Sequence, residues 1–283
     1  MNVDSLKAKI RNYAKSKNIP AQVLLQSYMF ERFLERISIS EYKDKFILKG
    51  GMLIAAIVGI ETRTTKDLDI TIRAYPLDEQ HIRLAVDEIC GIKLDDDIVF
   101  RSLGIESIRK DDKYGGLRVS LEAVYGTVIT HLSLDVTAGD MITPYAVRRS
   151  FISTLDEKKK IEMWAYNVET VLAEKVETIL RRGVFNTRMR DFYDVYILAT
   201  TQEWDDGIFR QAIGATSKHR ETASQIVDVE GILRSIQDSE EVISNWRKYQ
   251  QEYSYARKIS FEDVINKLKE ILVHGAVHII NDD

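Results

Sequence analysis

The sequence has few of the residues that mark secreted, membrane or metal-stapled proteins. Cys90 is the one cysteine among 283 residues, so no disulfide can form within the chain and a disulfide-rich scaffold is excluded. No apolar run reaches the ~18 residues that a membrane span needs. Residues 1–17 are polar and lack the apolar stretch of a signal peptide. We therefore expect a cytoplasmic protein with no membrane partner.

Two further absences narrow the function classes. The five histidines show no metal-ligand spacing, and none accompanies Cys90 or a serine in a nucleophile motif, which disfavours zinc enzymes and proteases. The net charge is −4, so the chain lacks the overall positive field of many nucleic-acid-binding proteins. Any site for a polyanion must therefore be local.

What is present indicates an α+β fold. With 45% apolar and 30% charged residues, the chain is large enough to bury a full core. Residues 20–37 form an amphipathic helical pattern, and short apolar runs, β-branched residues and glycine turns follow. The pattern predicts strands at 46–48, 68–72, 97–103, 117–125 and 128–137, with helices at 52–60 and 78–89. A mixed sheet with helices is the expected sum.

The pattern changes to a helical period from Asn167 onward. Asn167 is a predicted N-cap, and Arg181, Arg182 and Gly183 form a predicted helix end. Further helices are predicted at 189–200, 205–213, 218–236, 238–251 and 260–273. We therefore expect an α/β domain over 1–155 and a mainly helical domain over 156–283, joined near 150–165.

The strongest chemical signal is a glycine pair followed by two carboxylates. Asp67 and Asp69 stand one residue apart on a predicted strand, so they share a face. Two like charges this close call for a cation, and two hard oxygen ligands suit Mg²⁺. Gly50 and Gly51 begin a helix, where bare backbone N–H groups favour phosphate. Together they predict a site for a nucleotide and a metal ion.

The flanking residues add to this prediction. Lys49 precedes the glycine pair, and Arg63, Thr64 and Thr65 lie in the turn between the two motifs. We count Lys49, Arg63 and Thr65 among the nucleotide-binding candidates. Each motif alone has a simpler interpretation, as a turn or a solvated strand end, and the combination at this spacing favours the site.

A third carboxylate is available on the alternating strand around residue 135. Asp135 would complete a two-metal site or a site with a metal and a base. The alternative is that Asp135 and Asp140 simply lead a strand into a turn.

An independent signal comes from the helix that begins at Val168. Lys175 falls on the apolar stripe of this helix and should face inward. A buried ammonium needs a partner, so Lys175 should meet either a phosphate or a carboxylate. We favour the phosphate over a structural ion pair.

The next helix carries Asp191 and Asp194, which are neighbours on one helical surface and can reach Lys175 if the two helices pack antiparallel. A basic cluster lies around the intervening turn and could hold an RNA backbone, although it could also simply oppose the helix dipole. This cluster comprises Arg181, Arg182, Arg188 and Arg190.

Three aromatic residues, Trp246, Tyr249 and Tyr253, recur at roughly helical spacing. Their spacing is more typical of one packed helix face than of a platform on which nucleic-acid bases stack.

These motifs, in this order, resemble those of the AbiEii/AbiGii family of nucleotidyltransferase-like toxins. The matching segments are Phe46–Gly51, Arg63–Ile70, Lys175 and Arg190–Asp194, with the helical remainder similar only in general character. Met52 departs from the family pattern, which often has a hydroxyl residue there. The side-chain contact with phosphate that the resemblance implies at this position is therefore missing, which leaves only backbone donors there.

The resemblance implies a polymerase-β-like nucleotidyltransferase fold and site. The implied roles are triphosphate binding by Gly50 and Gly51, Mg²⁺ binding by Asp67 and Asp69, phosphate binding by Lys175, and a third acid or base at Asp191 or Asp194. It also implies a bacterial toxin linked to abortive infection and antiviral defence, neutralised by an antitoxin encoded nearby. The expected reaction is transfer of a nucleotide from an NTP to an acceptor hydroxyl, with a tRNA 3′ end as acceptor. The alternative is a non-catalytic GTP- or NTP-binding regulator that acts through a protein partner.

Overall fold

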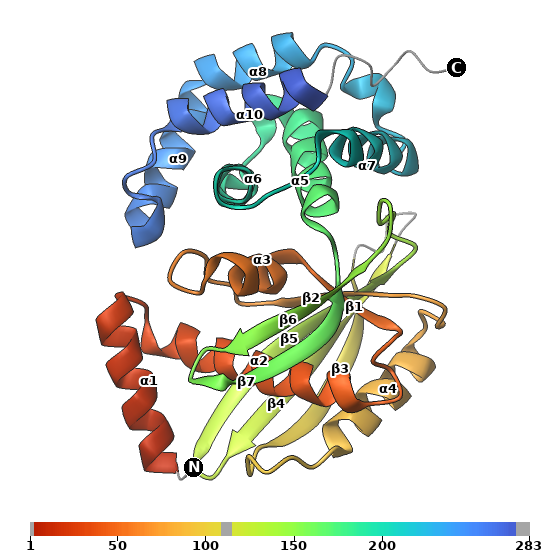
Figure 1. The fold of residues 1–283 in the computed structure, drawn as a ribbon, viewed down its shortest axis with the longest axis vertical. Coiled ribbons are helices and arrows are strands. Elements are labelled where there is room, and N and C mark those ends of the chain that lie inside the picture. The colour runs from red at the N-terminus through yellow and green to blue at the C-terminus, as the bar shows by residue number, and fades with distance from the viewer. Residues whose placement is uncertain (1–2, 109–114, 276–283) are drawn as a thin grey trace. The chain divides into compact units, whose positions relative to one another are not determined.

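The computed structural model describes residues 3–108 and 115–275. The chain divides into two compact units (Figure 1). The sheet unit comprises Met1–Asp140 and Ala146–Tyr166, and the helical unit comprises Met141–Tyr145 and Asn167–Asp283. The hairpin across 147–165, where the sequence indicates a joint, belongs to the sheet unit.

A seven-stranded mixed sheet in the order β3-β4-β5-β2-β1-β7-β6 forms the core of the sheet unit as described. Strand β1 runs antiparallel to β2 and parallel to β7, and β2 runs parallel to β5. The strands are β1 (Phe46–Lys49), β2 (Leu68–Ile72), β3 (Val99–Ile108), β4 (Gly116–Tyr125), β5 (Val128–Ala138), β6 (Val147–Ser153) and β7 (Asp156–Ala165). The predicted mixed sheet is therefore confirmed.

The two faces of the central strands differ in character. Leu48, Ile70 and Val136 pair across β1, β2 and β5, and all three are fully buried. Helix α2 (Ala21–Ile39) contacts β5 and β7, and α4 (Glu79–Gly91) packs on β3. Since side chains alternate along a strand, the residues between these apolar positions point to the opposite face, which carries the polar candidates.

The sheet unit also contains the helices α1 and α3. Helix α1 (Val3–Lys17) packs on α2, with Leu6, Ile10 and Ala14 buried. Helix α1 is not predicted from the sequence, because the segment is mostly polar. Its three buried side chains are enough for it to pack on α2. Helix α3 (Gly50–Val58) begins at the glycine pair and contacts β1 and β2.

Strands β6 and β7 were not predicted either. Strand β7 begins with the charged run Asp156–Lys160, which hides the alternation that Ile161, Met163 and Ala165 continue. These three side chains are buried, whereas the charged ones lie mostly at the surface. Pairing with β1 and β6 outweighs the low strand propensity of lysine and glutamate.

The helical unit contains the helices α5 to α10 and, in its described residues, the three short 3₁₀ turns η1 to η3. Their bounds are α5 (Val168–Arg182), η1 (Gly183–Phe185), α6 (Met189–Thr201), α7 (Asp206–His219), η2 (Ala223–Gln225), α8 (Val229–Asp238), α9 (Glu240–Glu252), η3 (Ser254–Ala256) and α10 (Phe261–Gly275). Helix α5 contacts α6 and α7, and α10 contacts α6, α7 and α8. The mainly helical C-terminal region is thus confirmed.

The predicted caps of α5 are correct, and one predicted helix is wrong. Asn167 accepts a hydrogen bond from the Thr170 backbone N–H at 2.8 Å, and Gly183 ends the helix with φ +51°. The helix expected at 218–236 is instead split by η2, and α8 begins only at Val229. Glu221 adopts φ +56° just after α7, which ends that helix. Asp228 accepts from the Gly231 N–H and so caps the start of α8. Both events fall within a continuous apolar pattern.

Candidate functional site

A row of four charged residues crosses the polar face of the sheet. The strand register pairs Arg118 with Asp135, Asp135 with Asp69, and Asp69 with Lys49, across β4, β5, β2 and β1. Paired residues on neighbouring strands share a face and lie about 5 Å apart. Two carboxylates therefore lie side by side in the centre of the sheet, with a cation at each end of the row.

The glycine pair lies directly against this row. Gly50 has φ +64°, and a Cβ atom there would stand 2.1 Å from Oδ2 of Asp69. The Gly51 N–H donates to the same oxygen over a long 3.4 Å. A side chain at residue 50 would displace the carboxylate, so this approach requires glycine. The structure thus brings together the two motifs that the sequence placed 18 residues apart.

The loop before β2 completes this corner. A Cβ atom on Gly51 would meet Oγ1 of Thr65 at 2.6 Å and the Arg63 guanidinium at 3.2 Å. Thr65 accepts from the Asp67 N–H at 3.4 Å and donates to the Asp67 carbonyl at 3.0 Å. Arg63 is buried and donates to the Thr64 carbonyl. The loop thereby fixes the backbone from which Asp67 projects.

Asp135 is held by an arginine that the sequence analysis did not select. Arg118 forms a bidentate ion pair with it, with Nε to Oδ1 at 2.7 Å and the second nitrogen to Oδ2 at 2.8 Å. Hydrogen bonding to Asp135 raises the pKa of Arg118 above its ordinary value. A signal for this pair did exist, because counting outward from the Tyr125 and Val128 pair of the β4–β5 hairpin places Arg118 opposite Asp135.

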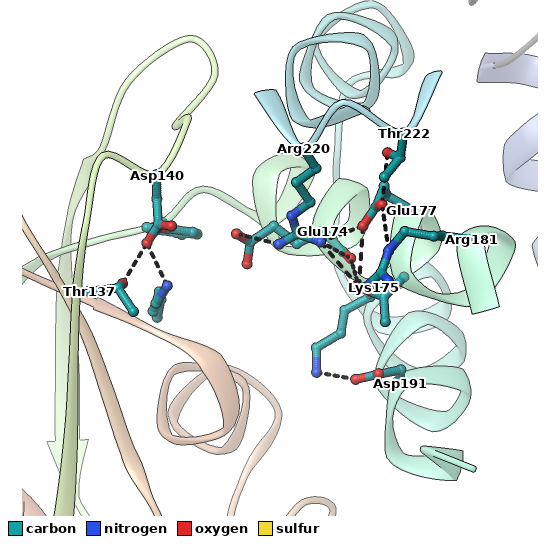
Figure 2. A network of polar contacts seen from close by, with 12 residues as sticks. Thr137, Asp140, Glu174, Lys175, Glu177, Arg181, Asp191, Arg220 and Thr222 are labelled. Atoms are coloured by element: carbon teal, nitrogen blue, oxygen red, sulfur yellow. Dashed lines mark hydrogen bonds and ion pairs between the residues drawn. The ribbon is translucent and has the colours of Figure 1, made fainter. Parts of the chain in front are cut away.

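Lys49 is likewise held by a carboxylate. Its ammonium lies 2.5 Å from Asp140, which also accepts from the Tyr166 hydroxyl at 3.0 Å. Asp140 accepts as well from the Thr137 hydroxyl at 2.7 Å (Figure 2). Burial raises the pKa of Asp140, but Lys49 and the hydrogen bonds from Thr137 and Thr71 outweigh it and lower the pKa to about 2. The sequence gives little indication of this role, since Asp140 follows the end of β5.

The chemistry of the carboxylates fits a magnesium ion with few protein ligands. Asp67 and Asp69 are half-buried and project from alternate positions of one chain segment. Asp135 adjoins Asp69, but both of its oxygens are engaged by Arg118. Over residues 3–108 and 115–275, no three or more histidine, cysteine or acidic side chains lie together so that they could hold a metal ion by themselves. Mg²⁺ suits such an arrangement because it keeps waters and shares substrate phosphates.

A second cluster of the predicted residues lies within the helical unit. The ammonium of Lys175 on α5 lies 2.6 Å from Asp191, as Figure 2 shows, and 3.0 Å from Asp194. Both acids are on α6. The Lys175 side chain is 16% exposed, whereas the two acids are 1% and 0% exposed. Arg188 contacts the second oxygen of Asp191 at 3.1 Å. The inward direction of Lys175 and its reach to both acids agree with the sequence analysis, and its phosphate contact stays a prediction.

Helix α5 also carries a buried carboxylate of its own, Glu177. It is fully buried and accepts from Arg181 at 3.1 Å, from the Thr222 hydroxyl at 2.9 Å and from Arg220 (Figure 2). Arg220 also binds Glu174 at 3.1 Å. A buried charge is tolerated only when it is paired and hydrogen-bonded in this way. Arg181, an RNA-binding candidate, thus also serves the interior of its own unit.

The remaining arginines of the predicted basic cluster lie near the end of α5 and at the start of α6. Arg182 is half-buried, and Arg188 has a side chain that is 51% exposed. Arg190 donates to the Tyr253 hydroxyl at 2.6 Å. RNA binding by these residues stays a prediction.

We call Lys49, Gly50, Gly51, Arg63, Thr65, Asp67, Asp69 and Asp135 the sheet cluster. We call Lys175, Arg188, Asp191 and Asp194 the helical cluster. Each is built within one unit, and the sheet cluster gains Arg118 and Asp140 as partners that hold its outer members.

Similarity to known structures extends over most of the chain. A structure described as JHP933 from Helicobacter pylori is 14% identical, with a TM-score of 0.47 and coverage of 89% of this chain and 90% of that chain. A putative nucleotidyltransferase from H. pylori is 14% identical, with a TM-score of 0.48 and coverage of 90% and 94%. An antigenic nucleotidyltransferase-like protein from Paracoccidioides brasiliensis is 13% identical, with a TM-score of 0.41 and coverage of 88% and 92%. The comparison with curated proteins gave no match.

The comparison with protein families is decisive. The family model described as "Nucleotidyl transferase AbiEii toxin, Type IV TA system" matches residues 32–267. This range includes both the sheet cluster and the helical cluster. Among the described residues, no helix combines the length and the apolar character needed to cross a bilayer. The chain therefore belongs to the AbiEii family of nucleotidyltransferase toxins of type IV toxin–antitoxin systems.

Proposed function

We propose that this toxin transfers a nucleotide from an NTP to the 3′ hydroxyl of an RNA, with tRNA as the acceptor, in a Mg²⁺-dependent reaction. The observation that supports this most strongly is the approach of Gly50 and Gly51 to Asp69, which joins a phosphate-binding backbone to a carboxylate row. Family membership supports the reaction class. The acceptor, the metal and the residue roles are proposals.

In the proposed reaction, the acceptor oxygen forms a bond to the α-phosphorus of the NTP. The bond between the α-phosphorus and the bridging oxygen breaks, and pyrophosphate leaves. The hydroxyl proton passes to a carboxylate, for which Asp135, Asp191 and Asp194 are the candidates. Mg²⁺, when bound by Asp67 and Asp69, would neutralise charge on the triphosphate.

The protein residues chiefly position the reactants and balance charge. The backbone N–H groups of Gly50 and Gly51, at the start of α3, would bind the phosphates, with the Gly51 N–H exchanging its long contact with Asp69 for a phosphate oxygen. Lys49, Arg63 and Thr65 lie beside them. We propose that Lys175 also binds phosphate. Its two carboxylate partners fix the position of the ammonium before the nucleotide arrives, which reduces the entropy cost of the reaction.

We further propose that a cognate antitoxin encoded nearby restrains this toxin in the cytoplasm, where NTPs and tRNA are available. The family description of a type IV toxin–antitoxin system supports the existence of such a partner. In this proposal, toxicity follows from the disabled acceptor RNA and would serve abortive infection against phage.

The test is incubation of the protein with each α-labelled NTP, Mg²⁺ and total RNA, with the labelled RNA resolved by size. We expect label at the size of tRNA, and loss of labelling when EDTA replaces Mg²⁺. The variant Asp69→Asn should reduce labelling by about 10³-fold or more, because it removes a charge that holds the metal beside the reacting phosphate.

The matched control is Asp87→Asn, which removes an exposed carboxylate on α4 and should leave labelling unchanged. Labelling by Asp69→Asn at the wild-type rate would overturn the proposed roles. Tight NTP binding with no labelled acceptor would instead favour a non-catalytic regulator.

A further inference from the structure

A group of aromatic and basic side chains lies where helix α6 meets the segment that follows α9. We define the tyrosine–arginine patch as Arg190, Tyr253, Tyr255, Arg257 and Lys258. All belong to the helical unit, at α6, at η3 and in the turn after it. Figure 1 labels α6, which carries Arg190, and α9, after whose last residue the other four follow in the chain.

The patch is held together by ring and cation contacts. The rings of Tyr253 and Tyr255 are stacked, with centroids 5.4 Å apart and planes 29° apart. Tyr249 packs against Tyr253 with centroids 4.7 Å apart. The Arg190 guanidinium lies 5.2 Å from the Tyr253 ring centroid and donates to its hydroxyl at 2.6 Å. These contacts fix the rings in place without a ligand, so that binding would cost little ordering entropy.

Burial separates the inner aromatic residues from the outer ones. Trp246 and Tyr249 are 1% and 6% exposed, and they serve the core, as the sequence spacing indicates. Tyr253 and Tyr255 are only half-buried and keep part of their surface toward solvent. The helix-face interpretation therefore accounts for two of the aromatic residues and leaves the stacked pair unexplained.

The charge of this segment is opposite to that of the whole chain. Residues 246–258 contain four basic residues, Arg247, Lys248, Arg257 and Lys258, and one acid, Glu252, in a chain of net charge −4. All four basic side chains are exposed. Stacked aromatic rings bordered by cations suit a single-stranded nucleic acid, whose bases stack while its phosphates pair with lysine and arginine.

Phe185, a few residues before α6, is another aromatic residue with basic neighbours in the sequence. Phe185 ends η1 and is 85% exposed, between Arg182 and Arg188 in sequence. The η1 turn contacts α9, which leads directly into the patch. Phe185 is thus an exposed aromatic side chain in the basic segment that leads into α6.

Helix α6 connects this patch with the helical cluster. Arg190 and Tyr193 on α6 contact Tyr253 and Tyr255, with Tyr193 and Tyr255 centroids 4.8 Å apart. Asp191 and Asp194 on the same helix bind Lys175. The same helix thus contributes residues both to the patch and to the helical cluster.

We propose that the tyrosine–arginine patch binds the unpaired 3′ end of the acceptor RNA, with its bases stacked on Tyr253 and Tyr255 and its phosphates on the flanking basic residues. This inference rests on the proposed transfer to RNA. It adds to that function the surface that recognises the acceptor and the requirement for a single-stranded end.

The experiment measures binding of a fluorescent single-stranded RNA hexamer by anisotropy in the absence of NTP. A hexamer with the same phosphates and two abasic 3′ positions serves as the second probe. The variants are Tyr253→Leu and Phe185→Ala in the full chain. Tyr145→Leu, which changes a loop tyrosine that is 68% exposed, is the matched control.

We expect Tyr253→Leu to weaken binding of the intact hexamer by about tenfold, as loss of one base stack does, and to leave binding of the abasic probe nearly unchanged. Phe185→Ala should weaken binding by a smaller factor without unfolding the protein, since its side chain is exposed. Tyr145→Leu should bind both probes like the wild type. Mg²⁺-dependent NTP binding should be the same in all variants.

Equal binding of the intact hexamer by wild type, Tyr253→Leu and Phe185→Ala would overturn the inference. So would variants that bind RNA normally and change only the inhibition by the antitoxin, because the patch would then be a protein interface. RNA binding that depends on Tyr253, with no nucleotide transfer, would contradict the proposed reaction and leave the patch as an RNA-binding site.

Discussion

The sheet cluster and the helical cluster use acidic residues in opposite ways. Asp67 and Asp69 are half-buried beside a glycine turn whose backbone has no side chain to block a ligand. Asp191 and Asp194 are almost fully buried and share the Lys175 ammonium, with Arg188 on the second oxygen of Asp191. The first arrangement suits acids that bind a ligand's cation. The second suits acids that position a side chain.

This difference suggests a division of work between the two units. The sheet unit would supply the metal and phosphate contacts, and the helical unit would supply a cation whose place is already fixed.

The buried charges of the helical unit should matter greatly for stability. Arg220→Met leaves Glu177 fully buried without its closest cation, so it should lower the free energy of unfolding by about 3 kcal/mol. Urea denaturation followed by circular dichroism measures this value. The matched control is Arg83→Met, which breaks an exposed pair with Glu79 and should cost less than about 0.5 kcal/mol. Equal losses of unfolding free energy in both variants would contradict the claim that the buried ion pairs matter more for stability than the exposed one.

The glycine turn tests the sheet cluster by geometry alone. Gly50→Ala places a methyl group 2.1 Å from Oδ2 of Asp69 and keeps φ at +64°, so the carboxylate must move. We expect nucleotide transfer to fall by about 10²-fold, as displacement of a reacting group by about 1 Å does.

The control is Gly91→Ala at the end of α4, where a methyl group meets nothing within 4 Å. This variant should transfer nucleotides at the wild-type rate. An active Gly50→Ala protein would mean that Asp69 need not occupy its observed place.

The pair of Asp140 and Lys49 should make stability depend on pH. The folded pKa of Asp140 is about 2, against an ordinary value of 3.8, so its contribution is complete above about pH 5 and is lost as the pH falls through 2. The difference corresponds to about 2 kcal/mol. Asp140→Asn should therefore be about 2 kcal/mol less stable at pH 7, and the gap from wild type should close toward pH 2. A gap that is independent of pH in urea titrations would contradict this assignment.

Much of the fold follows from local sequence patterns. The alternation over β4 and β5, the Asn167 cap and the Gly183 end of α5 are all readable, because each depends on neighbouring residues. Strands β6 and β7 and helix α1 are not, because their stability comes from packing against segments distant in the chain. The split between α7 and α8 was missed because a 3₁₀ turn interrupts an apolar pattern that continues across it.

The candidate site shows the same limit. Asp67, Asp69 and the glycine pair are recognisable because they form short motifs. The strand register then shows that Asp69 meets Asp135 and Lys49. Arg118 and Asp140 gain their importance from pairing across strands, so their own sequence neighbourhoods do not reveal it. Register, rather than motif, decides which charges share a row.

The most direct test of the account is nucleotide transfer by Lys175→Met, measured with α-labelled NTP and tRNA. We predict a loss of about 10²-fold or more, because a positioned charge on the phosphates disappears. Since this change also leaves two buried acids short of a cation, the double variant Lys175→Met/Asp194→Asn serves to restore charge balance. We expect it to regain the stability of the wild type and to remain inactive. Transfer at the wild-type rate by either folded variant would contradict the proposed role of Lys175 in the reaction.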